Sequence, residues 1–240
     1  MSKEKFISAI TASYPTVASS IYLGAGLLDG EIVPEAKVNL PLRMMNRHGL
    51  VTGATGSGKT RTLQLMAEQL SAAGVPVFIP DMKGDLSGMA KESATNEKLM
   101  ERAKALGINY APSGFPLEIY SLSGKLGAQM RATVTEFGPV LLSVSDVQSQ
   151  PMIFSTFMLS LLAELYQKLP EADDLDKPKL VFFLDEAHLL FNDAPKAFMD
   201  QIEQVIRLIR SKGVGIFFCT AEPIGAVQEI QRYRGSPECV

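Results

Sequence analysis

Eight consecutive residues carry the clearest chemical signal in this sequence: Gly53, Ala54, Thr55, Gly56, Ser57, Gly58, Lys59 and Thr60. They fit the pattern GxxxxGK[ST], in which glycines let successive backbone N–H groups turn inward around phosphate oxygens. The amino end of a following helix adds its positive dipole at the same place. Lys59 is expected to reach the β- and γ-phosphates of a nucleotide, and the Thr60 hydroxyl to bind Mg²⁺.

The residues around this loop favour a phosphate site over the alternative, a glycine-rich turn that binds nothing. An apolar run, residues 49–52, precedes the loop, and apolar residues at helical spacing follow from Arg61 to Ala73. A strand, a glycine loop and a helix are the context in which this pattern binds nucleotides. We therefore expect nucleotide binding by residues 53–60 and by Arg61, the next residue of the helix.

A second chemical signal follows an apolar run, residues 180–184, which leads directly into Asp185 and Glu186. At the end of a buried strand, Asp185 would help to hold Mg²⁺, and Glu186 would polarise the attacking water as general base. Buried strands often end in acids, so this pattern is specific only in combination with the glycine loop. His188 could sense the γ-phosphate, although packing at the start of the next segment is the simpler interpretation.

Three further polar residues follow apolar runs and are weaker site candidates. Asp81 and Lys83 come after the run of residues 75–80, and Thr220 after the run of residues 214–219. The ends of parallel strands line the crevice in which ligands bind, so Asp81 and Lys83 are expected near the site. A solvated turn explains these two residues equally well. Thr220 is where a polar sensor would meet the nucleotide.

A predicted helix lies before the last of these runs, with a start signal in residues 192–195. On its polar face, Glu203, Arg207 and Arg210 are four and seven positions apart. The simple interpretation is a surface pair of Glu203 with Arg207, worth a few tenths of a kcal/mol. The sharper one is an arginine, Arg210, that reaches across a subunit interface to a neighbour's γ-phosphate and is catalytic there. The residues alone favour the simple interpretation.

The apolar runs and the helical segments between them predict an α/β fold, with a parallel sheet covered by helices on both faces. Helices are expected at residues 97–106 and 152–168, and a short strand at 117–120. Residues 121–150 are weakly patterned.

The first part of the chain differs from the rest. Asp29-Gly30 between apolar pairs is a hairpin signal, and apolar and polar residues alternate from residue 38 to residue 42. We predict a small β element in residues 21–42, laid against the nucleotide domain, with residues 1–20 as a frayed or loosely packed lead-in. Residues 1–45 thus form an N-terminal part, and residues 46–220 the ATPase core.

Composition limits the remaining possibilities. With 46% hydrophobic and 20% charged residues, the chain is typical of a globular protein with a substantial core. A net charge of −3 gives no sign of a general nucleic-acid-binding surface, without excluding a local basic patch. Two cysteines without a paired framework fit a reducing cytoplasm. The longest apolar run, residues 152–163, is too short to span a bilayer, so we expect a cytoplasmic protein without membrane association.

Two known classes share parts of these motifs. The loop together with Asp185-Glu186-Ala187-His188 resembles the motif pair of DEAH-type superfamily 2 helicases, but the arginine-rich second domain of that family is reduced to the fragment 231–235. A GTPase interpretation can use residues 81–84 as DxxG. It lacks the [NT]KxD motif that reads guanine, and a glutamate next to the magnesium-binding aspartate is an ATPase feature. We therefore reject it.

Three longer runs, residues 46–60, 74–88 and 177–218, closely resemble the HerA-like ATPases of bacteria, of the YjgR type, in the HerA/FtsK superfamily. The resemblance implies a RecA-like ASCE core, a homo-oligomeric hexameric ring, and Mg²⁺-dependent ATP hydrolysis that drives double-stranded DNA through the ring. It also implies a nuclease or other protein as partner. Lys59, Thr60, Asp185 and Glu186 match the family motifs, and Arg210 lies where related motors carry an interface arginine.

The sequence departs from the family at two places. A long family insert is absent near residues 144–151, and the Gln-x-Pro sensor is replaced by Thr220-Ala221-Glu222-Pro223 before a C-terminal remnant, residues 221–240. Three functions therefore stay open. The first is a motor ATPase that translocates or unwinds DNA. The others are an ATP-dependent switch or assembly factor acting on a protein partner, and a DEAH-type helicase fragment.

Overall fold

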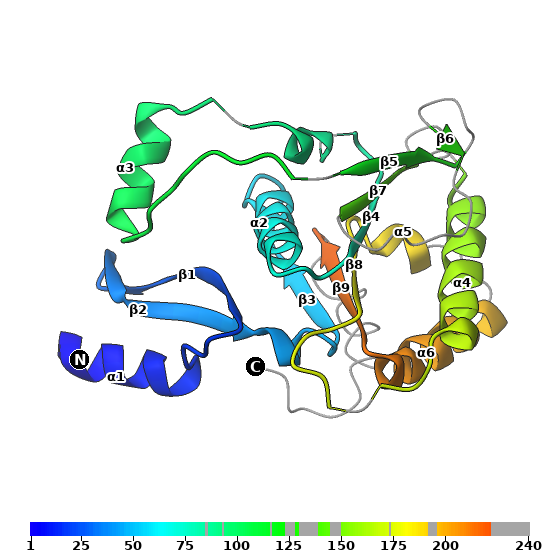
Figure 1. Ribbon diagram of the computed structural model, residues 1–240, viewed down its shortest axis with the longest axis horizontal. Helices are drawn as coiled ribbons and strands as arrows, with labels where there is room; N and C mark the ends of the chain where they lie inside the picture. The colour runs from blue at the N-terminus through cyan, green and yellow to red at the C-terminus, as the bar shows by residue number, and fades with distance from the viewer. Residues whose placement is uncertain are drawn as a thin grey trace.

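A central parallel sheet with helices on both faces organises the computed structural model (Figure 1). An antiparallel hairpin and a helix from the N-terminus lie beside it. The residues that the structure describes are 1–84, 86–92, 94–115, 117–122, 128–129, 139–144, 150–172, 174–191 and 196–221. The start signal predicted at residues 192–195 and most of the expected C-terminal remnant lie outside these ranges.

In the described part of the chain, seven strands form the central sheet in the order β3-β9-β8-β4-β7-β5-β6, and every pair among them is parallel. Their bounds are β3 Gly49–Thr52, β4 Val77–Asp81, β5 Glu118–Ser121, β6 Ala128–Gln129, β7 Pro139–Ser143, β8 Leu180–Leu184 and β9 Val214–Thr220. One added strand, β9, therefore separates β3, which leads into the glycine loop, from β8, which leads into the two acids. The predicted α/β fold with a parallel sheet is confirmed.

The helices cover the sheet in two layers (Figure 1). On one face lies α2 (Lys59–Ala72), and on the other lie α4 (Pro151–Lys168), α5 (His188–Phe191) and α6 (Lys196–Ile209). The remaining helical elements are α1 (Lys3–Ser13), α3 (Glu97–Ala105) and the short 3₁₀ turns η1 (Leu42–Met44), η2 (Ser87–Ala90) and η4 (Arg210–Lys212). The helices expected at residues 97–106 and 152–168 are confirmed to within one residue.

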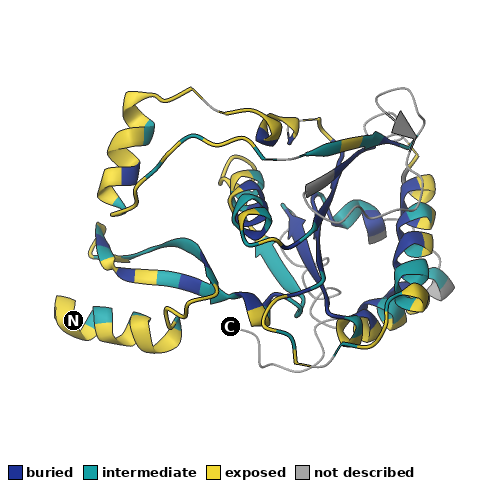
Figure 2. Ribbon diagram, viewed as in Figure 1, coloured by how far each residue is buried: buried dark blue, intermediate teal, exposed yellow. Residues whose placement is uncertain are grey.

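Strand β8 shows why the run of residues 180–184 is apolar throughout. All five side chains are buried, and they alternate between two hydrophobic clusters, one on each face of the sheet. Phe182 packs on Phe78 in the cluster that α4 and α6 cover, with ring centroids 4.9 Å apart. Phe183 packs on Phe217 in the cluster that α2 covers, at 5.5 Å. The strand before the acids is thus among the most buried parts of the molecule (Figure 2).

The N-terminal part contains the predicted hairpin and a helix that the sequence did not predict. Strands β1 (Ser20–Leu28) and β2 (Glu31–Pro41) pair antiparallel around Asp29-Gly30, whose φ angles of 52° and 87° suit a two-residue hairpin turn. Residues 3–13 of the expected lead-in form α1, capped by the Ser2 side chain. None of its residues is buried, which explains the weak periodicity.

One side chain ties this hairpin to the nucleotide domain. The amide of Gln69 on α2 accepts from Tyr22 N (2.7 Å) and donates to Tyr22 O (2.8 Å), as a neighbouring strand would. Gln69 therefore fixes β1 against the helix that follows the glycine loop.

Among the described helices, none is both long and apolar enough to cross a membrane.

Candidate functional site

The glycine loop connects β3 to α2 at the carboxyl edge of the sheet and is exposed from Ala54 to Gly58. Gly56 and Gly58 have φ angles of 81° and 95°, a region that side chains rarely adopt, and a Cβ on either would meet open space. The sequence therefore needs glycine here for the backbone turn. At Gly53 a Cβ would lie 2.6 Å from Ser57 Oγ, so the start of the loop closes tightly on itself.

The loop fits the phosphate group that the sequence pattern implies. Helix α2 begins after Gly58, which offers no side-chain cap, so the first N–H groups of the helix are left for another acceptor. An anion at this position would be held by those N–H groups and by the helix dipole. The Lys59 ammonium folds back over the same loop, donating to Gly53 O (2.7 Å) and Ala54 O (3.0 Å).

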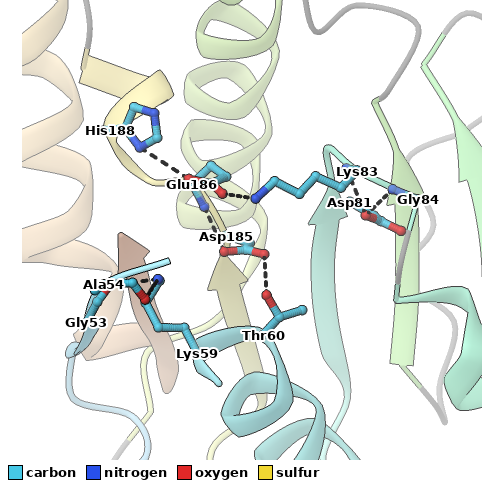
Figure 3. Close-up of polar contacts among 10 residues, drawn as sticks. All are labelled: Gly53, Ala54, Lys59, Thr60, Asp81, Lys83, Gly84, Asp185, Glu186 and His188. Atoms are coloured by element: carbon cyan, nitrogen blue, oxygen red, sulfur yellow. Dashed lines mark hydrogen bonds and ion pairs between the residues drawn. The ribbon is translucent and has the colours of Figure 1, made fainter. Parts of the chain in front are cut away.

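Thr60 and Asp185 come together although they are 125 positions apart in the sequence (Figure 3). The Thr60 hydroxyl donates to Asp185 Oδ2 at 3.5 Å, and Asp185 is buried. A hydroxyl and a carboxylate are oxygen donors of the kind Mg²⁺ uses, commonly with one or two carboxylates and the phosphates of the substrate. The described residues contain no group of three or more His, Cys, Asp or Glu side chains that could hold a metal ion.

Glu186 follows Asp185 in an unusual backbone conformation. Its φ of 50° lies in the left-handed region, which costs a non-glycine residue about 1–3 kcal/mol. Its N–H donates to Asp185 Oδ1 at 2.9 Å, so the two acids are locked in a fixed relation. The Glu186 carboxylate pairs with the Lys83 ammonium and lies 3.5 Å from His188 Nδ1, a contact without hydrogen-bond geometry (Figure 3).

The two candidates after β4 have different roles. Asp81 is buried and accepts from three backbone N–H groups, those of Lys83 (3.2 Å), Gly84 (2.7 Å) and Leu86 (3.2 Å). It therefore stabilises the turn. Lys83, held by that turn, extends to Glu186. The solvated-turn interpretation is wrong for Asp81, which is buried, whereas Lys83 does lie on an exposed turn and pairs from there with Glu186.

The three remaining candidates lie at different distances from the acids. Arg61, on the first turn of α2, is exposed and donates to Gln64 of its own helix (2.7 Å). Thr220 ends β9 and is paired in register with Thr52, which brings it to the site edge of the sheet between β3 and β8. Arg210 lies in η4, before β9 begins, at the opposite edge, about 20 Å away along a seven-residue strand.

Two titratable groups gave no signal in the sequence: His48, partly buried at the amino edge of the sheet, and Cys219, buried beside Asp185. His48 Nδ1 accepts from Ile216 N (3.2 Å), so Nε2 carries the proton and donates to Ile206 O (2.7 Å). Burial, and secondarily the charge of Arg210, lowers the pKa of His48 from 6.5 to about 4. Burial also raises the pKa of the Cys219 thiol, with the neighbouring Asp185 charge acting in the same direction.

Solved structures with the same fold are remote in sequence. VirB4 of Thermoanaerobacter pseudethanolicus is similar to this chain with a TM-score of 0.52 at 14% identity, over 91% of this chain and 81% of that one. The pCW3 conjugation coupling protein TcpA gives a TM-score of 0.44 at 16% identity, over 97% of this chain but 55% of its own. At that score the likeness to TcpA carries no argument, and the chain spans little more than half of that protein.

No protein with curated annotation matches the sequence significantly. The family described as "Helicase HerA-like C-terminal" matches residues 28–149 and 141–231, which together cover most of the chain. This match and the VirB4-like fold agree with the resemblance found in the sequence, although they leave the YjgR subtype untested. The chain therefore belongs to the helicase HerA-like C-terminal family.

Proposed function

We propose that this protein hydrolyses ATP and couples hydrolysis to the movement of double-stranded DNA. The observation that carries the ATPase part is the meeting of the glycine loop with two acids from another strand, through the 3.5 Å contact of Thr60 Oγ1 with Asp185 Oδ2. The family's helicase description supports the DNA part.

Each residue of the site has a role that its position supports. The N–H groups of the loop and the Lys59 ammonium bind the phosphates, while Thr60 and Asp185 hold Mg²⁺. When bound, the metal neutralises charge that develops on the phosphate oxygens. Glu186 orients the attacking water and accepts its proton as general base. The hydrogen bond from Glu186 N–H to Asp185 Oδ1 holds the base beside the carboxylate that would bind the metal.

Two substitutions separate binding from chemistry. Lys59→Ala removes a phosphate contact and is expected to abolish ATP binding or turnover. Glu186→Gln keeps the shape of the side chain and is expected to retain ATP while lowering turnover about 10²–10⁴-fold, the usual contribution of a general base. The readouts are the Kd of a fluorescent ATP analogue and the rate of phosphate release. Normal turnover by Glu186→Gln would remove the assignment of the base.

We propose that Arg210 acts on a neighbouring subunit, since about 20 Å separates it from its own Glu186. In a ring, the amino edge of one sheet would then approach the phosphates bound by the next subunit. Arg210→Ala and Lys59→Ala proteins should each be inactive alone. A mixture should recover part of the activity, because Lys59→Ala subunits can supply Arg210 to intact loops. A mixture without any recovery would contradict action between subunits.

The role of DNA is tested by its effect on the ATPase rate. Duplex DNA should stimulate hydrolysis by the full chain, and the effect should fall steeply with salt because phosphate contacts release counterions. The matched control is Glu186→Gln, which should bind DNA with the same salt dependence but without turnover. The motor hypothesis is refuted if duplex DNA at low salt changes neither the ATPase rate nor the electrophoretic mobility of the protein.

The second candidate is an ATP-dependent switch that acts on a protein partner. A net charge of −3 favours it, because a surface that binds nucleic acid is usually basic. Under this hypothesis the site hydrolyses ATP as described, and DNA has no effect on the rate of hydrolysis. A partner protein should bind the ATP-loaded Glu186→Gln variant and dissociate from the ADP-bound wild type.

A further inference from the structure

The ion pair between Lys83 and Glu186 joins two strand ends that lie side by side in the sheet. Lys83 follows β4, Glu186 follows β8, and these strands are hydrogen-bonded neighbours. The Lys83 ammonium contacts Glu186 Oε1 (Figure 3). The Glu186 side chain is 16% exposed and that of Lys83 51% exposed, so the pair lies at the rim of the site and not on open surface.

The turn that carries Lys83 is stabilised by hydrogen bonds to a buried side chain. The buried Asp81 carboxylate accepts the N–H groups of Lys83, Gly84 and Leu86, and Gly84 takes a φ of 76° that completes the turn. Three hydrogen bonds to one buried carboxylate leave the backbone of Lys83 little freedom. An ordinary surface ion pair has no such support on either side and contributes little.

The backbone and the carboxylate of Glu186 are also constrained. Its backbone is fixed by the left-handed φ of 50° and by the hydrogen bond from its N–H to Asp185. With Lys83 at Oε1 and His188 3.5 Å from Oε2, one oxygen of the carboxylate is directed toward each neighbour. A general base works only when its carboxylate is held in a narrow range of orientations toward the water it deprotonates.

We propose that Lys83 is a positioning residue for ATP hydrolysis, whose ammonium fixes the orientation of the Glu186 carboxylate. The inference rests on the proposed role of Glu186 as base. The sheet order separates Lys83 from the phosphates, because β4 is three strands from β3, about 14 Å across the sheet. The glycine loop and Lys83 thus lie on opposite sides of the acids, and Lys83 acts through Glu186.

The test replaces Lys83 by methionine, which keeps the length of the chain and removes the charge. Lys83→Met should lower kcat about ten-fold, less than loss of the base itself, with the Kd of the ATP analogue unchanged within about two-fold. Lys83→Arg should restore most of the rate, since arginine also pairs with carboxylates. The matched control is Lys168→Met, which removes an exposed lysine paired with Glu164 on α4 and should change neither quantity.

A contact measurement accompanies the kinetics. A water-soluble carbodiimide should join Lys83 to Glu186 in the full chain, giving a linked peptide pair by mass spectrometry that disappears in Lys83→Met and in Glu186→Gln. Absence of that pair in the wild type would overturn the contact. A kcat that is unchanged or raised in Lys83→Met would overturn positioning, as would a Kd that weakens in proportion to kcat, since Lys83 would then bind nucleotide.

These outcomes are distinct from failure of the proposed function. A wild-type protein that hydrolyses no ATP, or a Glu186→Gln protein with normal turnover, removes the base assignment whatever the cross-link shows. A wild type that hydrolyses ATP and depends on Glu186, but not on Lys83, removes only the positioning role.

Discussion

The clearest consequence of the partly buried His48 is a loss of stability in acid that one substitution should remove. Both ring nitrogens are used: Nδ1 accepts from Ile216 N and Nε2 donates to Ile206 O. Protonation of Nδ1 would bring its N–H against the N–H of Ile216, and would add a positive charge near Arg210. The folded protein therefore holds His48 neutral, while the unfolded chain protonates it readily below its ordinary pKa.

The magnitude follows from the two pKa values. The pKa of His48 is 6.5 in the unfolded chain and about 4 in the fold. Between these values the unfolded state binds more protons, so the free energy of unfolding falls as the pH falls. The full loss is about 3.4 kcal/mol below both values, of which about 2 kcal/mol falls between pH 7 and pH 5.

The assay is urea unfolding of wild type and His48→Gln at several pH values between 7 and 5, followed by far-ultraviolet circular dichroism because the chain has no tryptophan. Glutamine can donate and accept but does not titrate in this range. All other ionisable groups are common to both proteins, so their contribution cancels in the difference. The variant should lose about 2 kcal/mol less than wild type across this range. Parallel losses in the two proteins would refute the reasoning.

Three further substitutions rank contacts outside the site by their contribution to stability. Gly215→Ala would place a Cβ 1.8 Å from Met45 O, a backbone atom, and should lower the free energy of unfolding by about 1–3 kcal/mol or more. Gln69→Leu leaves the N–H and C=O of Tyr22 without their partner and should cost about 1–3 kcal/mol. Arg207→Ala breaks only a helix-surface pair and should cost about 0.3–0.5 kcal/mol. Urea unfolding at pH 7 measures all three, and a cost for Arg207→Ala equal to that of Gly215→Ala would contradict the ranking.

The features that the sequence predicted well are those encoded over short stretches. The glycine loop lies within eight residues, and the run before Asp185 is apolar throughout because both faces of β8 are covered. Asp29-Gly30 predicts its hairpin because that turn needs two positive φ angles in succession. In each case the local pattern and the tertiary structure impose the same requirement on the same residues.

The features that could not be predicted depend on distant parts of the chain. Strand β9 pairs with β3 across 168 positions of sequence, Gly49 with Phe217, and a pairing so distant leaves no local pattern. The pairing of Lys83 with Glu186 spans 103 positions, and a lysine after a strand has the same appearance in a solvated turn. His48 follows Arg47 in a polar stretch, and its hydrogen bonds to Ile206 of α6 and Ile216 of β9 come from parts of the chain more than 150 positions away.

The site combines a rigid half with an adaptable one, and the order of the elements explains why. Asp185 and Glu186 are attached to β8, a fully buried strand, and the turn after it is held by Ala187 N on Cys219 O and Leu189 N on Glu186 O, both at 2.8 Å. These hydrogen bonds can hold the backbone of Glu186 at its positive φ angle. We therefore expect the two acids to keep their geometry whether or not a ligand is present. The glycine loop is exposed, with free space around Gly56 and Gly58, and its lysine rests on its own backbone carbonyls. Nucleotide binding should therefore reorganise the loop around fixed acids, so that the free energy of binding is used to order the half that holds the phosphates.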